Sequence, residues 1–245
     1  MVIGVIPARL DSIRFPKKIL ANLGGKPMVA YVAEQATKAE KLDKVIIAID
    51  AKETEQALLE YDFKLVMTSK NHASGTDRVA EVAKGEPEAK IIINIQGDEP
   101  LLNPKLIDGL VDIFHDPGVE MATVVSRKLT VSDLLNPNVV KAILDENQNT
   151  QDFKRNVFDM EIGAVYRHIG MYGFQRDTLF EFTAQEPSER EQKKSLEQLR
   201  ALDHGIPIKA LIANCDQMAV DTPEDLQRVA AVMGLDLDEA KVMDD

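Results

Sequence analysis

The sequence predicts an α/β fold with a mostly parallel central sheet and helices on both of its faces. Two observations predict it. Short runs rich in β-branched residues, such as 45–49 and 91–95, are typical of strands that are covered on both sides. In the first half of the chain these runs alternate with segments of helical periodicity, which is the pattern of parallel strands joined by crossover helices.

The elements of the first half can be placed in order. Strands are predicted at residues 2–6, 45–49, 65–67, 91–95 and 121–125. One helix is expected from Pro27, because proline fits the first helical turn and apolar residues follow at helical spacing. Another is expected from Asn103 and Pro104, where asparagine can cap the helix and proline can begin it.

The second half has a different pattern. Strands are predicted at residues 139–144, 168–174 and 208–213, and a charged helix is predicted over 188–202. The last helix is expected to begin at Thr222 and Pro223, with Asp225 completing the cap. The stretch between the first two strands is polar and has no clear period.

Composition limits the classes of function. The chain has 245 residues, a formal net charge of -12 and a pI of about 4.9, which argues against a nucleic-acid partner. Its single cysteine excludes an internal disulfide. We expect no membrane segment and no signal peptide, and therefore a cytoplasmic protein.

A cationic turn follows the first strand. Arg9, Arg14, Lys17 and Lys18 lie within ten residues of an otherwise acidic chain. The carboxyl end of a strand is where open α/β sheets bind ligands, and backbone amides with Arg and Lys suit phosphate oxygens. A solvated basic loop is the simpler explanation of a charge cluster, but the position after the strand favours a triphosphate site. The chain contains neither a Walker loop nor a dinucleotide glycine fingerprint.

Two carboxylates are candidates for a metal site. Asp98 follows the strand at 91–95, within Gln96-Gly97-Asp98-Glu99-Pro100, and Asp221 precedes the cap of the last helix. Mg²⁺ is usually held by one or two carboxylates together with substrate phosphates, so this pair would meet its demand. A turn with solvated acids and an ordinary helix cap are the alternatives.

Two further motifs were considered. Ser74 and Thr76 stand at the start of a helix, where capping alone would explain them. Arg78 lies in the first turn, where the helix dipole disfavours a cation, so we expect a ligand or a carboxylate partner for it. His168 lies in a predicted strand, where a histidine is more often structural than catalytic.

Together these segments resemble the 3-deoxy-manno-octulosonate (Kdo) cytidylyltransferases. The resemblance runs from the first strand to the last helix, in order. It is carried by IPARLDSIRFPKKIL (6–20), GGKPM (24–28), MTSKNHASGTDRV (67–79), NIQGDEP (94–100), NPNVVK (136–141), RHIGMYGF (167–174), SLEQLRAL (195–202) and VDTPEDL (220–226).

The resemblance implies a single nucleotidyltransferase domain over 1–245. Its nucleotide-binding part would be mainly 1–130, its sugar-acid-binding and dimerisation part 131–215, and its metal loop and C-terminal helix 216–245. It implies a homodimer that converts CTP and Kdo to CMP-Kdo and pyrophosphate for lipopolysaccharide biosynthesis.

The resemblance also implies roles for residues. Arg9, Lys18, Asp98 and Asp221 would be the catalytic set, with Asp98 and Asp221 as ligands of Mg²⁺. The other implied contacts are with CTP (Ala8, Arg9, Lys18, Ser74, Thr76, Arg78 and Gln96) and with the sugar acid (Gln96, Arg155, His168, Glu197 and Gln198).

The sequence departs from the family pattern in two places. Lys17 and Ile19 replace the usual Gly and Pro. The tract at 145–165 is shortened, and within it Phe153-Lys154-Arg155 stands where the family has Phe-Ser-Arg, which is why Arg155 is the candidate for the sugar carboxylate. Two alternatives therefore stay open: a cytidylyltransferase for a variant acid such as 8-amino-Kdo, and a CTP-binding protein without turnover.

Overall fold

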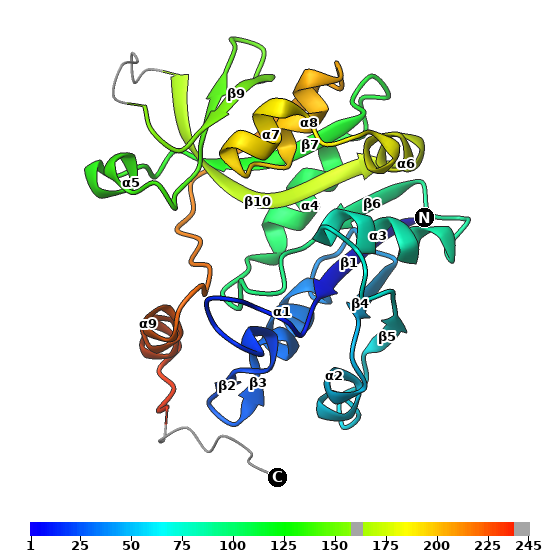
Figure 1. The fold of residues 1–245 in the computed structure, drawn as a ribbon, viewed down its shortest axis with the longest axis vertical. Coiled ribbons are helices and arrows are strands. Elements are labelled where there is room, and N and C mark those ends of the chain that lie inside the picture. Colours follow the sequence, from blue (N-terminus) through cyan, green and yellow to red (C-terminus); the bar gives the residue numbers. More distant parts are fainter. Residues whose placement is uncertain (158–163, 238–245) are drawn as a thin grey trace.

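The computed structural model describes residues 1–157 and 164–237. Within them, nine strands form one mixed sheet, whose principal strands lie in the order β11-β7-β10-β6-β1-β4-β5 (Figure 1). Its strands are β1 (Val2–Ala8), β4 (Lys44–Ile49), β5 (Lys64–Met67), β6 (Ile91–Asn94), β7 (Met121–Ser126), β8 (Lys141–Leu144), β9 (Thr150–Lys154), β10 (Val165–Gln175) and β11 (Ile208–Ala213). A two-stranded ribbon pairs β2 (Asn22–Leu23) with β3 (Lys26–Pro27).

The helices follow the predicted alternation. They are the 3₁₀ turn η1 (Lys18–Leu20), α1 (Met28–Ala36), α2 (Lys52–Ala57), α3 (Gly75–Lys84), α4 (Pro104–Ile113), α5 (Val131–Leu135), α6 (Arg176–Ala184), α7 (Glu189–Lys194), α8 (Gln198–Asp203) and α9 (Pro223–Met233). Asn103 caps α4 by accepting a hydrogen bond from the Lys105 amide, and Thr222 caps α9 together with Asp225. Both caps confirm what the sequence predicted.

Two cores lie on opposite faces of the sheet. Successive strand residues alternate between them: Ile46 packs into one core and Ile47 into the other. One core gathers the apolar faces of α3, α6 and α8, and the other gathers those of α1 and α4. Helices therefore cover both faces, as the continuous apolar runs predicted.

Strand β10 breaks the parallel order of the principal strands. It lies between β6 and β7 and is antiparallel to both, while β1, β4, β5 and β6 pair in parallel. Its first residues also pair with the β8–β9 hairpin. The second half of the chain thus contributes to the same sheet as the first.

The predicted helix over 188–202 is wrong as a single element. It is two short helices, α7 and α8, separated at Ser195, whose φ of 52° is left-handed. Arg200 of α8 forms a bidentate ion pair with Glu191 of α7, with N···O distances of 2.8 and 2.6 Å. Both side chains are almost buried, so this pair fixes the angle between the two helices.

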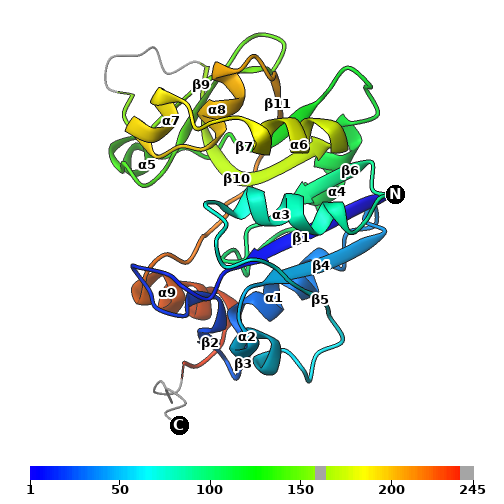
Figure 2. The same ribbon diagram turned by 45° about the vertical axis from the view of Figure 1, so that its right-hand side comes forward.

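The order of strands creates the site. The chain moves from β1 outward to β4 and β5, then returns to place β6 on the other side of β1. At such a reversal the loops after adjacent strands diverge and leave a crevice, which is where open α/β sheets bind ligands. Figure 2 shows α9 beside the dark-blue loop that follows β1. A third apolar cluster, which includes Leu23 and Leu226, holds α9 there.

In the described part of the chain, no helix combines the length and the apolar character that crossing a membrane would require.

Glu191→Ala is expected to lower the free energy of unfolding by about 3–5 kcal/mol, because it leaves the buried guanidinium of Arg200 without its carboxylate. Glu189→Ala in the same helix removes only an exposed ion pair with Lys193, so it should change the free energy of unfolding by less than about 1 kcal/mol. Urea unfolding of both variants checks this. Equal midpoints would contradict the importance of the buried pair.

Candidate active site

A cavity of about 300 Å³ opens at the carboxyl ends of β1 and β6. The loop after β1 contributes Arg9, Arg14 and Lys18, and the loop after β6 contributes Gln96 and Asp98. The cationic turn and the Gln-Gly-Asp segment, which were separate predictions, therefore line one cavity. Gly97 suits this close approach, because a Cβ on it would lie 3.1 Å from the Pro7 carbonyl oxygen, which is tighter than most such contacts.

The two predicted metal ligands converge on one point. The Lys18 ammonium lies 2.5 Å from Asp98 Oδ2 and 3.2 Å from Asp221 Oδ1. The Asp98 carbonyl also accepts a hydrogen bond from the Val220 amide at 2.9 Å. Burial lowers the pKa of Lys18, but the two carboxylates outweigh burial and raise it above its usual value. Two acids 123 residues apart in the chain are thus placed to share one cation.

The cationic loop is charged but constrained. Arg14 donates to Asp221 Oδ1 at 2.8 Å, and Lys17 pairs with Glu53 at 2.7 Å, while Arg9 is exposed. Lys17 has a left-handed φ of 54°, a conformation that glycine adopts more readily than a residue with a Cβ. Ile19, the other departure, is buried against the core that contains α1 and α4.

Asp50, which sequence reasoning missed, organises the start of this loop. Its Oδ1 accepts the Leu10 amide at 3.0 Å, and its Oδ2 accepts Nη2 of Arg78 at 2.9 Å. Arg78 also donates to the Thr68 hydroxyl and is 1% exposed. The expected carboxylate partner of Arg78 is therefore confirmed. Asp50 directly follows the strand at 45–49, so its position at the carboxyl edge was a signal that could have been used.

The beginning of α3 reaches toward the second half of the chain. Ser74 caps the helix with Asp77 in a capping box, as the sequence predicted. Thr76 does not cap it; its hydroxyl donates to Glu197 Oε2 at 2.7 Å and accepts from Asn94 Nδ2 at 3.3 Å. Burial raises the pKa of Glu197, against the hydrogen bond that its carboxylate accepts from Thr76.

Two buried acceptors in this cluster have no hydrogen-bond partner among residues 1–157 and 164–237. They are Glu197 Oε1 and Asn94 Oδ1. A buried acceptor without a donor is costly.

Gln198, which was also expected at the sugar acid, begins α8 and is buried.

His168 is a neutral side chain here. Its Nε2 lies 3.0 Å from the Thr123 hydroxyl, and its ring contacts Phe153 edge-on and Tyr172 at 5.4 Å between centroids. Burial lowers the pKa of His168 to about 3. Gln96, in the loop after β6, reaches the same strand, because its amide donates to the Gly170 carbonyl of β10 at 2.9 Å.

Arg155 is held by the backbone. Its guanidinium donates to the carbonyls of Lys194, Ser195 and Pro137 at 3.0–3.1 Å. These contacts tie β9 to the turn between α7 and α8, just before Glu197 and Gln198. Part of the altered tract, residues 158–163, lies outside the described residues.

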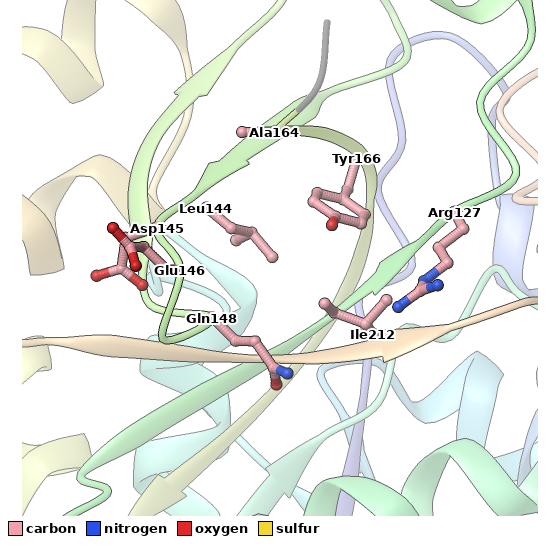
Figure 3. Close-up of a pocket in the computed structure, with 8 residues that line it drawn as sticks. All are labelled: Arg127, Leu144, Asp145, Glu146, Gln148, Ala164, Tyr166 and Ile212. Atoms are coloured by element: carbon pink, nitrogen blue, oxygen red, sulfur yellow. The ribbon is translucent and has the colours of Figure 1, made fainter.

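Figure 3 shows a second hollow, of about 350 Å³, beside the β8–β9 hairpin. Arg127 lies on one side of it and Asp145 and Glu146 lie on the other, with Tyr166 between them. It contains none of the predicted site residues and is separate from the cavity at β1 and β6.

The comparisons with known proteins fit this geometry. A family model described as cytidylyltransferase matches residues 3–210. The chain is 41% identical to 3-deoxy-manno-octulosonate cytidylyltransferase of Pelobacter propionicus, covering 92% of this chain and 94% of that protein. It is 42% identical to the protein of the same name from Neisseria meningitidis, covering 93% and 96%.

Solved structures agree. A CMP:2-keto-3-deoxy-manno-octonic acid synthetase complexed with CTP has a TM-score of 0.88 and 35% identity, over 95% of this chain and 98% of that one. A 4-diphosphocytidyl-2C-methyl-D-erythritol synthase from Anaerococcus prevotii shares the fold, with a TM-score of 0.65 and 14% identity. The match covers 95% of this chain and 98% of that one. The fold and the cavity therefore define a nucleotidyltransferase. The chain belongs to the cytidylyltransferase family, and within it to the 3-deoxy-manno-octulosonate cytidylyltransferases.

The low pKa of His168 has a consequence for stability. Unfolding restores an ordinary pKa near 6.5, so below that pH the unfolded state binds the proton more readily. The contribution of His168 to stability is therefore complete above about pH 6.5 and is lost as the pH falls toward 3. We expect His168→Asn to flatten the dependence of unfolding free energy on pH in that window, with exposed His115→Asn as control. An NMR pKa near 6.5 for the folded protein would contradict this.

Proposed function

We propose that this protein transfers CMP from CTP to Kdo, giving CMP-Kdo and pyrophosphate, an activated sugar for lipopolysaccharide biosynthesis. The observation that carries the proposal is the convergence of Asp98 and Asp221 on one cationic point, within the cavity lined by Arg9 and Lys18. The names of relatives at about 40% identity supply the substrates.

Mg²⁺ is the cofactor that this donor set suits. Two carboxylate oxygens within 3.2 Å of a single nitrogen atom are oxygen ligands aimed at one place, and Mg²⁺ takes one or two carboxylates with phosphate oxygens. When bound, it would neutralise charge on the phosphates as the new bond forms. Among described residues no cluster of three possible ligands occurs, and the proposed site rests on these two carboxylates together with the oxygens that the triphosphate would supply.

The protein's own residues would bind and orient two anions. Arg9, Arg14 and Lys18 would draw the triphosphate into the cavity. The rest of this acidic chain would repel it. Gln96, Glu197 and neutral His168 would hold the sugar acid. Its anomeric hydroxyl would attack the α-phosphorus in line and release its proton to solvent, while the bond from the α-phosphorus to the oxygen that bridges to the β-phosphorus breaks and pyrophosphate leaves. The protein's contribution would be positioning and fixed charge.

This proposal also includes the cellular compartment and the oligomeric state. We place the reaction in the cytoplasm, where CTP is available. We propose a homodimer formed through the part that contains α5, because Val131 and Leu135 of that helix are 73% and 58% exposed. Sedimentation analysis would give the mass of a single chain if this is wrong.

Asp98→Asn and Asp221→Asn are each expected to lower kcat by roughly 100-fold or more at saturating Mg²⁺, while the fold is retained. Asp216→Asn, an exposed acid of the same linker, is the matched control and should stay near the wild-type rate. Pyrophosphate release is the measurement. Near-normal rates in both site variants would defeat the two-carboxylate assignment.

The choice of sugar acid is tested by substrate. Kdo, 8-amino-Kdo and other 2-keto sugar acids are compared by kcat/KM, with CTP saturating. Kdo is expected to be preferred; preference for the amino sugar would establish the variant enzyme. Tight binding of Mg²⁺ and CTP without release of pyrophosphate for any acid would instead establish a non-catalytic protein.

Arg155→Ala is expected to raise the KM for the sugar acid more than the KM for CTP. Loss of its contacts with the Lys194 and Ser195 carbonyls releases the turn before Glu197, and this is expected in addition to any contact of the guanidinium with the sugar carboxylate. Arg190→Ala, which removes an ion pair with Asp152 from the same region, is the control. A larger effect on CTP would show that Arg155 serves the nucleotide half.

A further inference from the structure

Glu99 and Gln217 form a buried polar pair behind the carboxylates. Gln217 Nε2 donates to Glu99 Oε2 at 2.9 Å, and the two residues are 4% and 7% exposed respectively. Glu99 directly follows Asp98, and Gln217 lies four residues before Asp221. The hydrogen bond thus joins the two segments that carry the acids.

The segment that carries Asp221 needs such a bond. Residues 214–221, between β11 and α9, belong to no helix or strand. Within the described residues, the Val220 amide also donates to the Asp98 carbonyl, and Lys18, from a third segment, bridges Asp98 and Asp221. Without regular structure, the position of Asp221 depends on a few discrete contacts.

The cations are unsuited to fix the separation of the acids. Lys18 and Arg14 stand in the loop that would receive the triphosphate, and phosphate oxygens compete for both side chains. The pair of Glu99 and Gln217 is buried away from that competition. It therefore persists when the nucleotide draws the cations away.

A third residue steadies Gln217 from the sheet. Arg167 Nη2 donates to the Gln217 carbonyl at 2.7 Å. Arg167 belongs to β10 and precedes His168, so the linker is fastened to the strand that carries the sugar-side histidine. Gln217 is thus held through its backbone by β10 and holds, through its side chain, the loop of Asp98.

We propose that Gln217 is a positioning residue that sets the separation of Asp98 and Asp221 through its hydrogen bond to Glu99. This rests on the proposed function, because it assigns the two acids to the metal. Hydrogen-bonding partners behind metal ligands typically change metal affinity or activity 10–100-fold when they are removed.

The test uses Gln217→Met, which keeps the length of the side chain and removes the donor. Mn²⁺ binding is followed by loss of the free-ion EPR signal, with CTP at half the protein concentration and no sugar acid, so no turnover occurs. CTP affinity is measured separately at saturating Mn²⁺. Gln175→Met, which removes a hydrogen bond to the Val119 carbonyl at the far end of β10, is the matched control.

We expect Gln217→Met to weaken Mn²⁺ binding about tenfold and to change CTP affinity less than twofold. Glu99→Met should weaken Mn²⁺ binding to the same extent, and the double variant should bind Mn²⁺ no more weakly than either single variant. Glu99→Gln should keep an Mn²⁺ affinity near that of wild type, because its amide oxygen still accepts the hydrogen bond. Unchanged Mn²⁺ affinity in folded Gln217→Met, or equal damage from Glu99→Gln and Glu99→Met, would overturn the proposal.

If Gln217→Met does not fold, Arg167→Met replaces it and should weaken Mn²⁺ binding about threefold, by the same route. Wild-type affinity in that variant overturns the proposal. Asp98→Asn and Asp221→Asn distinguish a failure of the metal assignment from a failure of the positioning role. If they bind Mn²⁺ as tightly as wild type, the metal assignment itself fails. If they lose Mn²⁺ while the Gln217 and Glu99 variants keep it, only the positioning role fails.

Discussion

The buried ion pair of Arg78 and Asp50 is the contact on which the geometry of the cationic loop depends. Removing one member would leave the other charged and buried, which is among the costliest changes a core can suffer. The pair links α3, the end of β4 and the amide of Leu10, so it fixes where the cationic loop leaves the sheet. Arg78 therefore supports this loop through Asp50, from inside the protein.

The cavity balances opposite charges within a small volume. Asp98 and Asp221 would repel each other if no cation stood between them, and Lys18 supplies that cation in the structure described here. The cavity thus keeps its cations beside the carboxylates that attract them, so a chain with a net charge of -12 still presents a cationic surface at this edge of the sheet.

Most of the sheet could be predicted because its strands are continuous apolar runs, and periodicity is a local property. The β1 and β6 loops could be placed together for the same reason, since parallel strands end at one edge. The antiparallel insertion of β10 could not be predicted, because nothing in its own sequence states which strands flank it. The break at Ser195 was missed because serine rarely takes a left-handed φ, and the buried pair of Glu191 and Arg200 is a tertiary contact.

The site was predicted in the same uneven way. Asp98 and Asp221 were identified from their places beside a strand end and a helix cap, and the structure brings them together. Gln217 gave no signal, because a glutamine in an irregular linker is ordinary until its partner is known. Glu99 stood within the quoted motif, but its burial could be known only from the fold. Burial, followed by repulsion from Asp98, raises the pKa of Glu99 to about 7.

The backbone at Lys17 bears on how the cationic loop is held in place. A left-handed φ costs a residue with a Cβ roughly 1–2 kcal/mol. Lys17 pairs with Glu53, and the next residue, Lys18, pairs with Asp98 and Asp221. The unfavourable turn is therefore anchored on both of its lysines to three separate segments of the chain, so the loop keeps its shape through side-chain contacts and not through its own backbone preference.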